Sequence, residues 1–335
     1  MTTPYPVSAN MHRLAREDRL RAALFRGANL TLENPLYLRA LRALVDALLH
    51  QDVGPGDLTV EALRLRGRAG RVLIRAKEDG VLAGLAEAAW IYRRSRLEAR
   101  PLKRDGDDIR TGETILEVEG EAGDLLSLER LAVNLLQRMS GIATATKRIA
   151  DAVRKISPGT HIVGTRKTPW GMLDKRALHL GGGGTHRLGL ADAILIKTNH
   201  LALASEAAAS SIETPLRQAW KRRGSAAFFE VEVTTHDTAL DAARVLHDLQ
   251  AGDADSFCPC LLMLDNLSSQ EAARVVAALA GAGLLENVLV EASGKVSPQL
   301  AEAFAASGVD AISIGALTHS AKALDLSATV APQAK

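Results

Sequence analysis

The sequence is poor in cysteine and contains no long apolar run. Its 335 residues include two cysteines, Cys258 and Cys260, which form a single Cys-Pro-Cys motif. A structural zinc site needs about four ligands, and a disulfide framework needs further pairs, so we expect reduced thiols with a structural role. No stretch is apolar for long enough to span a bilayer, and the N-terminus lacks the apolar core of a signal peptide. We therefore expect a cytoplasmic protein with no membrane partner.

The chain also lacks a large excess of charge of either sign, and it has no internal repeat or low-complexity segment. Its formal net charge is +2, which gives no global electrostatic case for binding nucleic acid. A basic run over residues 93–104 is more simply explained as a solvated helix face or a subunit contact than as a polyanion site. With 47% apolar and 24% charged residues, the composition is that of a soluble globular protein, and the length predicts two domains.

Six apolar segments separated by helical segments predict a parallel α/β structure in the second half of the chain. The predicted strands are residues 161–164, 193–196, 228–233, 261–266, 288–294 and 311–316. Alternation of apolar and polar residues does not distinguish a barrel from an open doubly wound sheet. Upstream, strands at residues 71–76 and 114–119 accompany helical segments, which indicates an α/β sandwich.

Helices are predicted before these parallel strands as well, one of them from about Leu85. Residues 1–30 are charged and irregular apart from a short helix, and residues 34–50 have the apolar spacing of a longer one. Residues 125–150 predict a long amphipathic helix, followed by a second helical segment around Ser140 and Gly141.

Basic side chains follow two of the predicted strands and the glycine-rich run between them. They are Arg166, Lys167, His186, Arg187 and Lys197. Because parallel barrel strands present their carboxyl ends at one rim, we expect these groups to converge on one cleft. Like charges held close together are costly unless they are paired, so the cleft predicts a ligand with several negative charges.

Three glycine-containing turns lie near the same predicted rim. Gly181–Gly184 is not a P-loop, because no Gly-Lys-Ser/Thr follows, and it is not a dinucleotide fingerprint, because no strand leads directly into it. We interpret it as a tight loop that directs the following His-Arg pair. The pairs Ser293-Gly294 and Gly315-Ala316 follow the last two strands, where backbone N–H groups of such turns can bind a phosphate.

Two acids, Glu232 and Asp265, lie at or near the ends of neighbouring predicted strands. Paired carboxylates at this position suit a Mg²⁺ ion or the two hydroxyls of a ribose. Magnesium keeps several waters and bridges to substrate phosphate, so two carboxylates are sufficient. A simpler role, compatible with the first, is salt bridging to the basic groups of the cleft.

Three motifs in this region resemble those of the quinolinate phosphoribosyltransferase family, the carboxylating nicotinate-nucleotide pyrophosphorylases. They are, in order, Thr165-Arg166-Lys167-Thr168, the glycine-rich run ending in His186-Arg187, and Ile196-Lys197-Thr198-Asn199-His200. The resemblance extends from about Asp52 to Leu326. It implies an N-terminal α/β sandwich domain, here residues 1–130, followed by an incomplete parallel α/β barrel of the type II phosphoribosyltransferase kind, here residues 131–335. The last residues of the chain can also pack back on the N-terminal domain.

The resemblance implies Mg²⁺-dependent phosphoribosyl transfer from phosphoribosyl pyrophosphate to quinolinate with decarboxylation, giving nicotinate mononucleotide in NAD biosynthesis. The residues with an implied catalytic role are Lys167, Lys197, Glu232 and Asp265, the last two also as metal ligands. Those implied to bind the substrate are Arg130, Arg166, Lys167, His186, Arg187 and Lys197. Those implied to bind phosphate are Ser293, Gly294, Lys295, Gly315 and Ala316. Arg130 would reach across a homodimer, or a higher homo-oligomer, so that the active sites are shared. Glu230 and Arg138 are expected to be structural.

The sequence departs from the family pattern at several cleft positions. The segment Pro169–Leu173 is shorter than the corresponding segment of the family and lacks its arginine. Three single residues also differ, because Thr185 replaces an asparagine, Thr198 an aspartate and Lys295 a glycine of the family pattern. Lys295 would add a phosphate contact or adopt a positive φ at some cost. Two alternatives therefore stay open, namely transfer to a different carboxylated heteroaromatic acid, and a non-catalytic, transport-associated protein of the same fold. The complete set of basic and acidic cleft residues argues against the second.

Overall fold

The structure is a computed structural model of the chain and describes residues 15–204, 212–253 and 258–331. The chain forms two compact units. The first comprises residues 1–26, 149–167 and 183–316, and the second comprises residues 27–148, 168–182 and 317–335. The irregular start expected for residues 1–14 lies outside the described residues. The predicted domain boundary between residues 130 and 131 falls within one long helix and stays a prediction.

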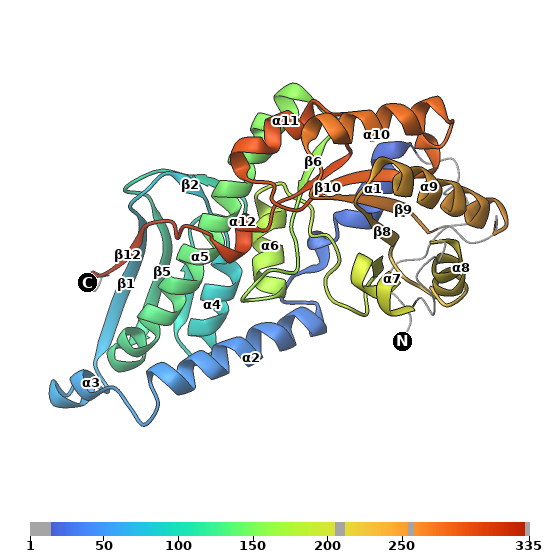
Figure 1. Ribbon diagram of the computed structural model, residues 1–335. Helices are drawn as coiled ribbons and strands as arrows, with labels where there is room; N and C mark the ends of the chain where they lie inside the picture. Colours follow the sequence, from blue (N-terminus) through green and yellow to red (C-terminus); the bar gives the residue numbers. More distant parts are fainter. Residues whose placement is uncertain (1–14, 205–211, 254–257, 332–335) are drawn as a thin grey trace. The chain divides into compact units, whose positions relative to one another are not determined.

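A six-stranded parallel sheet, with the strand order β6-β11-β10-β9-β8-β7, forms the centre of the first unit (Figure 1). The strands are β6 (His161–Val163), β7 (Ile194–Ile196), β8 (Phe229–Val233), β9 (Cys260–Asp265), β10 (Leu289–Ser293) and β11 (Ala311–Ser313). Strands β7 to β11 are neighbours in chain order, and the first strand, β6, pairs with the last, β11. This circular order, open between β6 and β7, is that of a barrel and differs from a doubly wound sheet. The incomplete barrel that the resemblance implied is therefore confirmed.

The opening beside β6 is partly bridged by the glycine-rich run. Gly184 forms a parallel bridge with Val163, and the N–H of Gly164 donates to the carbonyl of Gly184 at 2.9 Å. A Cβ on Gly184 would lie 2.8 Å from Cγ1 of Val163, so this close approach requires glycine.

Helices and short 3-10 turns connect the strands of the barrel. They are α7 (Thr198–Ala204), α8 (Glu213–Lys221), α9 (His236–Ala251), α10 (Ser269–Gly281), η3 (Leu285–Asn287), η4 (Pro298–Leu300) and α11 (Ala301–Ala305). Helix α9 packs on β8 and β9. Helices α9 and α10 each begin with a capping box, formed by Thr235 with Thr238 and by Ser268 with Glu271. Such caps satisfy the first N–H groups of a helix, and each stabilises it by about 1 kcal/mol.

Alternation along the strands sorts the inward-facing side chains into layers. The base is an apolar cluster with one residue in or just before each strand, namely Val163, Ala193, Phe228, Leu261, Leu289 and Ala311. Two residues further along, the same strand faces carry Glu230, Met263, Glu291 and Ser313. After two more residues, at the carboxyl ends, they carry Glu232, Asp265 and Ser293. The interior thus changes from apolar at the base to charged at the rim.

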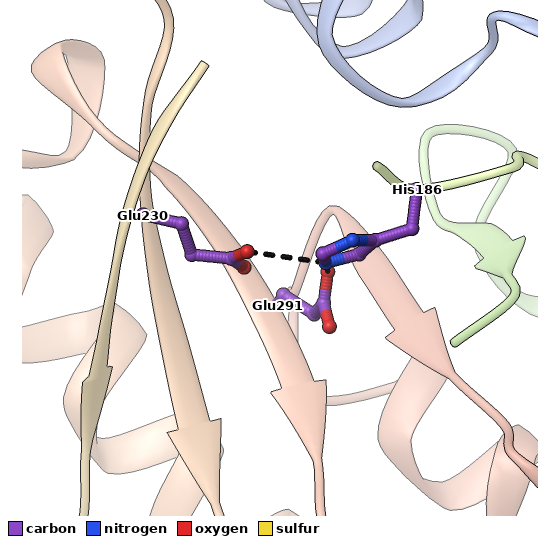
Figure 2. Close-up of side chains that lie close together, drawn as sticks. All are labelled: His186, Glu230 and Glu291. Atoms are coloured by element: carbon purple, nitrogen blue, oxygen red, sulfur yellow. Dashed lines mark ion pairs between the residues drawn. The ribbon is translucent and has the colours of Figure 1, made fainter. Parts of the chain in front are cut away.

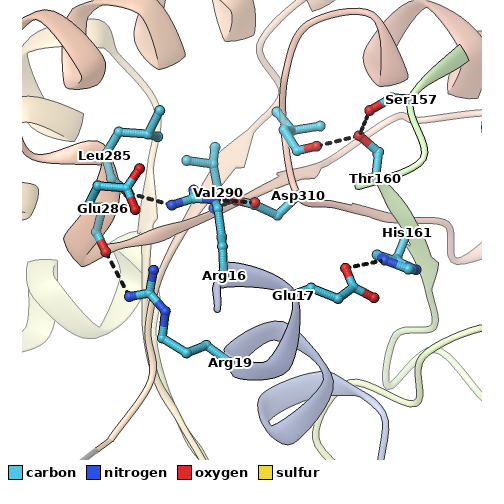
Figure 3. A network of polar contacts seen from close by, with 11 residues as sticks. Arg16, Glu17, Arg19, Ser157, Thr160, His161, Leu285, Glu286, Val290 and Asp310 are labelled. Carbon is cyan, nitrogen blue, oxygen red and sulfur yellow. Dashed lines mark hydrogen bonds and ion pairs between the residues drawn. The ribbon is translucent and has the colours of Figure 1, made fainter. Parts of the chain in front are cut away.

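Helix α1 (Arg16–Leu24) closes the base of the barrel. Its apolar side chains join the apolar cluster, namely Leu20, Ala23 and Leu24. Polar contacts anchor it to the amino ends of two strands, since Arg16 Nε is 2.5 Å from Asp310 Oδ1 and Glu17 Oε2 is 2.8 Å from His161 Nε2 (Figure 3). The short helix expected in this region is confirmed, but nothing in its charged sequence indicated that it closes the base of the barrel.

The second unit contains a four-stranded antiparallel sheet with the order β12-β1-β5-β3. Its strands are β1 (Ala69–Ala76), β3 (Glu98–Pro101), β5 (Thr114–Glu121) and β12 (Leu326–Ala331), and a separate pair is formed by β2 (Gly80–Val81) and β4 (Asp108–Ile109). Its helices are η2 (Gly27–Asn29), α2 (Pro35–Asp52), α3 (Leu58–Ala62), α4 (Leu85–Arg94), α6 (Met172–Leu180) and α12 (Ala316–His319). Strand β12, from the end of the chain, pairs with β1, and α4 packs on β3 and β5.

Helix α5 (Ala122–Ile156) is continuous over 35 residues. The prediction of a second helical segment around Ser140 and Gly141 is therefore wrong. These residues instead permit close packing, because a Cβ on Gly141 would lie 2.0 Å from the carbonyl oxygen of Lys322. The hydroxyl of Ser140 accepts the N–H of Ala83 at 3.0 Å. Among the described helices, including this one, none is both long enough and apolar enough to cross a membrane.

Candidate active site

The carboxyl ends of the barrel strands carry most of the side chains that the sequence singled out. These are Arg166 and Lys167 after β6, Lys197 after β7, Glu232 in β8, Asp265 at the end of β9, Ser293 at the end of β10, and Gly315 and Ala316 after β11. Because the strands are parallel, their carboxyl ends meet at one rim of the barrel. The rim therefore brings together basic groups, carboxylates and glycine turns from six strands.

Glu232 is 7% exposed and is oriented by the residues that follow β7. Its Oε1 accepts the backbone N–H of Thr198 at 3.1 Å and the hydroxyl of Thr198 at 2.8 Å. Lys197 Nζ lies 3.8 Å from its Oε2. Thr198, one of the departures from the family pattern, thus holds this carboxylate in place. Sequence reasoning did not assign it that role, although a hydrogen-bond donor next to a rim lysine was visible.

Glu232 and Asp265 are carboxylates on the same face of two neighbouring strands, β8 and β9. Glu232 is in register with Met263, and Asp265 lies two residues beyond Met263 on the same face of the neighbouring strand. The half-buried Asp265 accepts a hydrogen bond from Asn266 Nδ2 through its Oδ2 at 2.6 Å. Mg²⁺ prefers such carboxylate oxygens and needs only one or two of them, because it retains waters and binds substrate phosphates. The residues present therefore fit this ion.

Arg166 and Arg187 bring two guanidinium groups within electrostatic reach of each other. Burial lowers the pKa of Arg187, and the positive charge of Arg166 lowers it further, whereas Glu230 and Asp192 act in the opposite direction. The side chain of Arg187 also donates through Nη1 to the carbonyl of Ala193 at 3.4 Å. An anion bound between two such groups would relieve their repulsion, so this part of the site favours a negatively charged ligand.

His186 lies inside the barrel, where it contacts two buried glutamates (Figure 2). Its Nε2 is 3.1 Å from Glu230 Oε2 and 3.2 Å from Glu291 Oε2. Burial lowers the pKa of His186, but the two carboxylates outweigh this effect and raise the pKa to about 10. Burial and the charge of Glu291 raise the pKa of Glu230 to about 7. The proximity of these groups thus favours sharing of protons over full ionisation of both carboxylates.

Sequence reasoning placed His186 among the substrate-binding groups, gave Glu230 a structural role and missed Glu291. In the structure these three side chains form one cluster, and none of them is an exposed group of the rim. The signal for Glu291 was a single acid on the inward face of an otherwise apolar strand. A charge in such a position needs a buried partner, and the sequence offered no means to identify it.

The turn after β10 is shaped by Gly294, which has a φ of 76°. The carbonyl of Ser293 accepts the N–H of Asn266 at 3.1 Å. A Cβ on Gly294 would lie 2.6 Å from the backbone nitrogen of Asn266, so no larger residue fits without movement. Lys295 has a φ of 22°, so it does adopt the positive φ that the sequence comparison with the family suggested.

Arg138, in the second unit, has structural contacts. Its Nε and Nη2 donate to the two oxygens of Asp174 at 2.9 and 2.8 Å, and Nη2 also donates to the carbonyl of Thr318 at 2.9 Å. Asp174 further accepts the hydroxyl of Thr168 and the N–H of Trp170, whose ring lies 5.1 Å from the Arg138 guanidinium. This network holds the shortened segment that differs from the family.

Arg130, on α5 in the second unit, has a side chain that is 62% exposed. Its Nη2 is 3.8 Å from Glu129 Oε1. An exposed ion pair of this length is weak, so the guanidinium keeps most of its capacity to bind another charged group.

Two family models match this chain. The model described as "Quinolinate phosphoribosyl transferase, N-terminal domain" matches residues 57–140. The model described as "Quinolinate phosphoribosyl transferase, C-terminal domain" matches residues 142–329. Together they span well over half of the chain.

Individual proteins show similarity over the same extent. A "Probable nicotinate-nucleotide pyrophosphorylase [carboxylating]" from Bacillus subtilis is 37% identical over 295 residues, which cover 87% of this chain and 93% of the relative. One of the same description from Methanothermobacter thermautotrophicus is 36% identical over 286 residues, covering 85% and 96%. Among solved structures, the nicotinate-nucleotide pyrophosphorylase from Francisella tularensis has a TM-score of 0.74 at 28% identity, covering 88% and 96%. NadC from Streptococcus pyogenes has a TM-score of 0.74 at 30% identity, covering 87% and 97%.

Replacing Gly294 by alanine is expected to lower the free energy of unfolding more than the same change at Gly283. Both glycines have a positive φ, of 76° and 70°, but nothing lies within 4 Å of a Cβ at Gly283. Backbone strain is therefore common to both variants, and overpacking against Asn266 adds about 1–3 kcal/mol at Gly294 alone. Urea unfolding followed by circular dichroism measures the difference. Equal losses in the two variants would contradict the tight turn.

Proposed function

The chain belongs to the quinolinate phosphoribosyltransferase family, and we propose that it transfers the phosphoribosyl group of phosphoribosyl pyrophosphate to quinolinate. The ring nitrogen of quinolinate bonds to C1 of the ribose, pyrophosphate leaves and CO₂ is lost, which gives nicotinate mononucleotide. The observation that carries the proposal is the gathering of Arg166, Lys197 and Glu232 at the rim of one parallel barrel, with Arg187 in electrostatic reach of Arg166. The names of the relatives support the same reaction.

The basic groups provide a site for a pyridine dicarboxylate. An arginine binds a carboxylate through two parallel hydrogen bonds, and Arg166 and Arg187 supply two such groups, of which Arg187 is affected by the charge of Arg166. Lys167 and Lys197 would contact the remaining carboxylate and pyrophosphate oxygens. A doubly charged acid therefore matches the site better than a neutral or singly charged ring.

The acidic groups and the glycine turns provide a site for phosphoribosyl pyrophosphate. Glu232 and Asp265 would hold the ribose hydroxyls and a Mg²⁺ ion, which when bound would neutralise charge on the pyrophosphate. Thr198 keeps the Glu232 carboxylate in position for this role. Backbone N–H groups of residues 293–295 and 315–316 would bind the 5-phosphate, and the Lys295 ammonium adds a positive charge to that end of the site.

The reaction requires little covalent chemistry from the protein. Most of the rate enhancement would come from holding the two substrates in line and from stabilising the departing pyrophosphate. Once the ring nitrogen carries a positive charge, loss of CO₂ from the adjacent carbon leaves an electron pair beside that charge, and a proton from water then bonds to that carbon. The groups that hold the ring and the leaving group therefore determine the rate.

We further propose a homodimer, or a higher homo-oligomer, in which Arg130 of one subunit binds the substrate of its partner. The side chain is exposed, and its ion pair with Glu129 is long, so it can add a third guanidinium to a dianion site. Location in the cytoplasm, expected from the sequence, stays a prediction.

The proposed reaction is tested with the purified protein, phosphoribosyl pyrophosphate, Mg²⁺ and either quinolinate or nicotinate, with nucleotide and CO₂ measured by mass spectrometry. Nicotinate mononucleotide and CO₂ are expected from quinolinate. Product from nicotinate alone would retain phosphoribosyl transfer and overturn the decarboxylation. Absence of product with both acids would contradict the proposed acceptor and lead to a panel of other heteroaromatic acids.

Lys197→Ala is expected to lower kcat by about 10²–10³ without unfolding the protein, because it removes a positive charge at the leaving group. The side chain is 47% exposed and adds little to the core. Lys221→Ala, at the exposed end of α8, is the matched control and should keep wild-type turnover. Steady-state kinetics and thermal melting measure both variants. Full activity of Lys197→Ala would remove this residue from the site.

Glu232→Gln is expected to weaken Mg²⁺-dependent binding of phosphoribosyl pyrophosphate by about tenfold or more. Glutamine keeps the size of the side chain and can still accept the hydrogen bonds of Thr198, but it loses the charge that attracts the ion. Calorimetric titrations with and without Mg²⁺ separate the two contributions. Glu302→Gln, on the exposed face of α11, serves as the control. Unchanged binding, or an equal loss without Mg²⁺, would count against the metal role.

Co-expression of Arg130→Ala and Lys197→Ala chains is expected to restore activity that each variant lacks alone. If Arg130 acts in the partner's site, the mixed dimer contains one site with both residues intact. If each site uses its own chain's residues, every site in the mixture is defective. Differently tagged chains allow purification of the mixed species before the assay. A mixed dimer as inactive as its parents would argue against shared sites.

A further inference from the structure

His186 has a geometry that direct contact with a substrate does not explain. Its side chain is buried, and the side chains of Glu230 and Glu291 are fully buried. One oxygen from each carboxylate lies within 3.2 Å of the same ring atom, Nε2 (Figure 2). A ring nitrogen that faces two buried carboxylates is not available to a ligand at the rim.

The other ring nitrogen fixes the position of the ring proton. Nδ1 of His186 accepts the backbone N–H of Arg187 at 2.8 Å. A neutral imidazole has one N–H and one lone pair, so this contact uses the lone pair and places the hydrogen on Nε2, toward the glutamates. The carboxylates raise the pKa of His186 and so favour a second ring proton. That proton would lie on Nδ1, where it would face the N–H of Arg187, a donor at 2.8 Å. The contact geometry therefore favours a ring with a single proton, on Nε2.

The same hydrogen bond argues against a metal ion in this cluster. The ligand atoms of His186, Glu230 and Glu291 all lie within 4.8 Å of one another, which is a spacing that a metal ion can bridge. A metal at Nε2 needs the lone pair of that atom, and the ring would then normally carry its hydrogen on Nδ1 and donate it to an acceptor. Here Nδ1 faces a donor instead. The cluster is therefore better suited to hold a protonated Nε2 than an ion.

The backbone at His186 adds a second constraint. Its φ of 53° lies in the left-handed region, which is unfavourable for a residue with a Cβ atom. The carbonyl of Leu24, at the end of α1, accepts the N–H of Thr185 at 2.7 Å and that of His186 at 3.1 Å. The imidazole also meets the ring of Phe228 edge-on, with 5.3 Å between centroids. Contacts from the base and from the interior of the barrel thus fix both the backbone and the ring.

Arg187 is the residue whose position depends on this arrangement. Its backbone N–H is bonded to the fixed ring, and its guanidinium extends to the carbonyl of Ala193. We propose that His186 is a positioning residue, held by Glu230 and Glu291 so that Arg187 can bind a carboxylate of the pyridine acid. The assignment rests on the proposed function for the identity of that acid. His186 itself does not touch the substrate.

Kinetics of three variants test the proposal. His186→Asn keeps an acceptor for the Arg187 N–H and tolerates the positive φ, but it cannot reach the glutamates. Glu291→Leu removes a partner that no substrate contacts. Each substitution is expected to raise the KM for quinolinate by about tenfold without changing the KM for phosphoribosyl pyrophosphate. The double variant should have a KM for quinolinate no higher than that of either single variant, because both substitutions disrupt the same arrangement. Met263→Leu, a volume-conserving change on the inward face beside Glu291, is the control.

An unchanged KM for quinolinate in Glu291→Leu, combined with a raised KM in His186→Asn, would show that His186 acts by direct contact and would overturn the proposal. The proposal would also be overturned if the increases in KM of the two single variants multiplied in the double variant, because the two residues would then act independently.

A nitrogen NMR measurement tests the ring without requiring turnover. In protein labelled with ¹⁵N-histidine, the resonances of His186 are identified by their loss in His186→Asn. A protonated Nε2 and an unprotonated Nδ1 are expected, before and after addition of quinolinate. An unprotonated Nε2, or stoichiometric zinc in the purified protein that Glu291→Leu abolishes, would overturn the proposal. The protein could also show the expected protonation of His186 but no turnover of quinolinate. That result would contradict the proposed acceptor and leave the positioning role of His186 intact.

Discussion

Every second residue of a parallel barrel strand faces the interior, and in this barrel the interior is filled from the base upward. Helix α1 and an apolar cluster close the base. The charges of Glu230 and Glu291 lie one layer above, where surrounding water is excluded and unpaired charges are costly. Their pairing with His186 is therefore a requirement of the fold, and the direction of the loop that carries His186 follows from it.

The same contacts connect the base of the barrel to its rim. The last residue of α1, Leu24, accepts hydrogen bonds from Thr185 and His186, and His186 in turn accepts the N–H of Arg187. The backbone of Arg187, the residue proposed to bind substrate, is thus fixed by a chain of short contacts that begins at the helix closing the base of the barrel. Groups held in this way lose little conformational freedom on binding, which favours affinity for a charged ligand.

Two departures from the family pattern have local structural explanations. Thr198 stands where the family has an acid, and it donates two hydrogen bonds to Glu232, whereas an acid at that position would repel this carboxylate. The shortened Pro169–Leu173 segment follows Thr168 and includes Trp170, both of which donate to Asp174, and Asp174 is paired with Arg138. Local compensation of this kind is compatible with the family's reaction.

The sequence by itself determined the parallel strands, the order of the motifs and most members of the rim, because alternation and short motifs are properties of neighbouring residues. It did not determine that α5 is continuous through Gly141, that α1 closes the base of the barrel, or that His186 turns inward. In strand register, Met263 lies opposite Glu291 on one side and Glu232 on the other. His186, however, contacts Glu291 and Glu230. The tilt that strands adopt in a barrel and the left-handed backbone at His186 bring those three side chains together, and neither can be read from the spacing of residues along the chain.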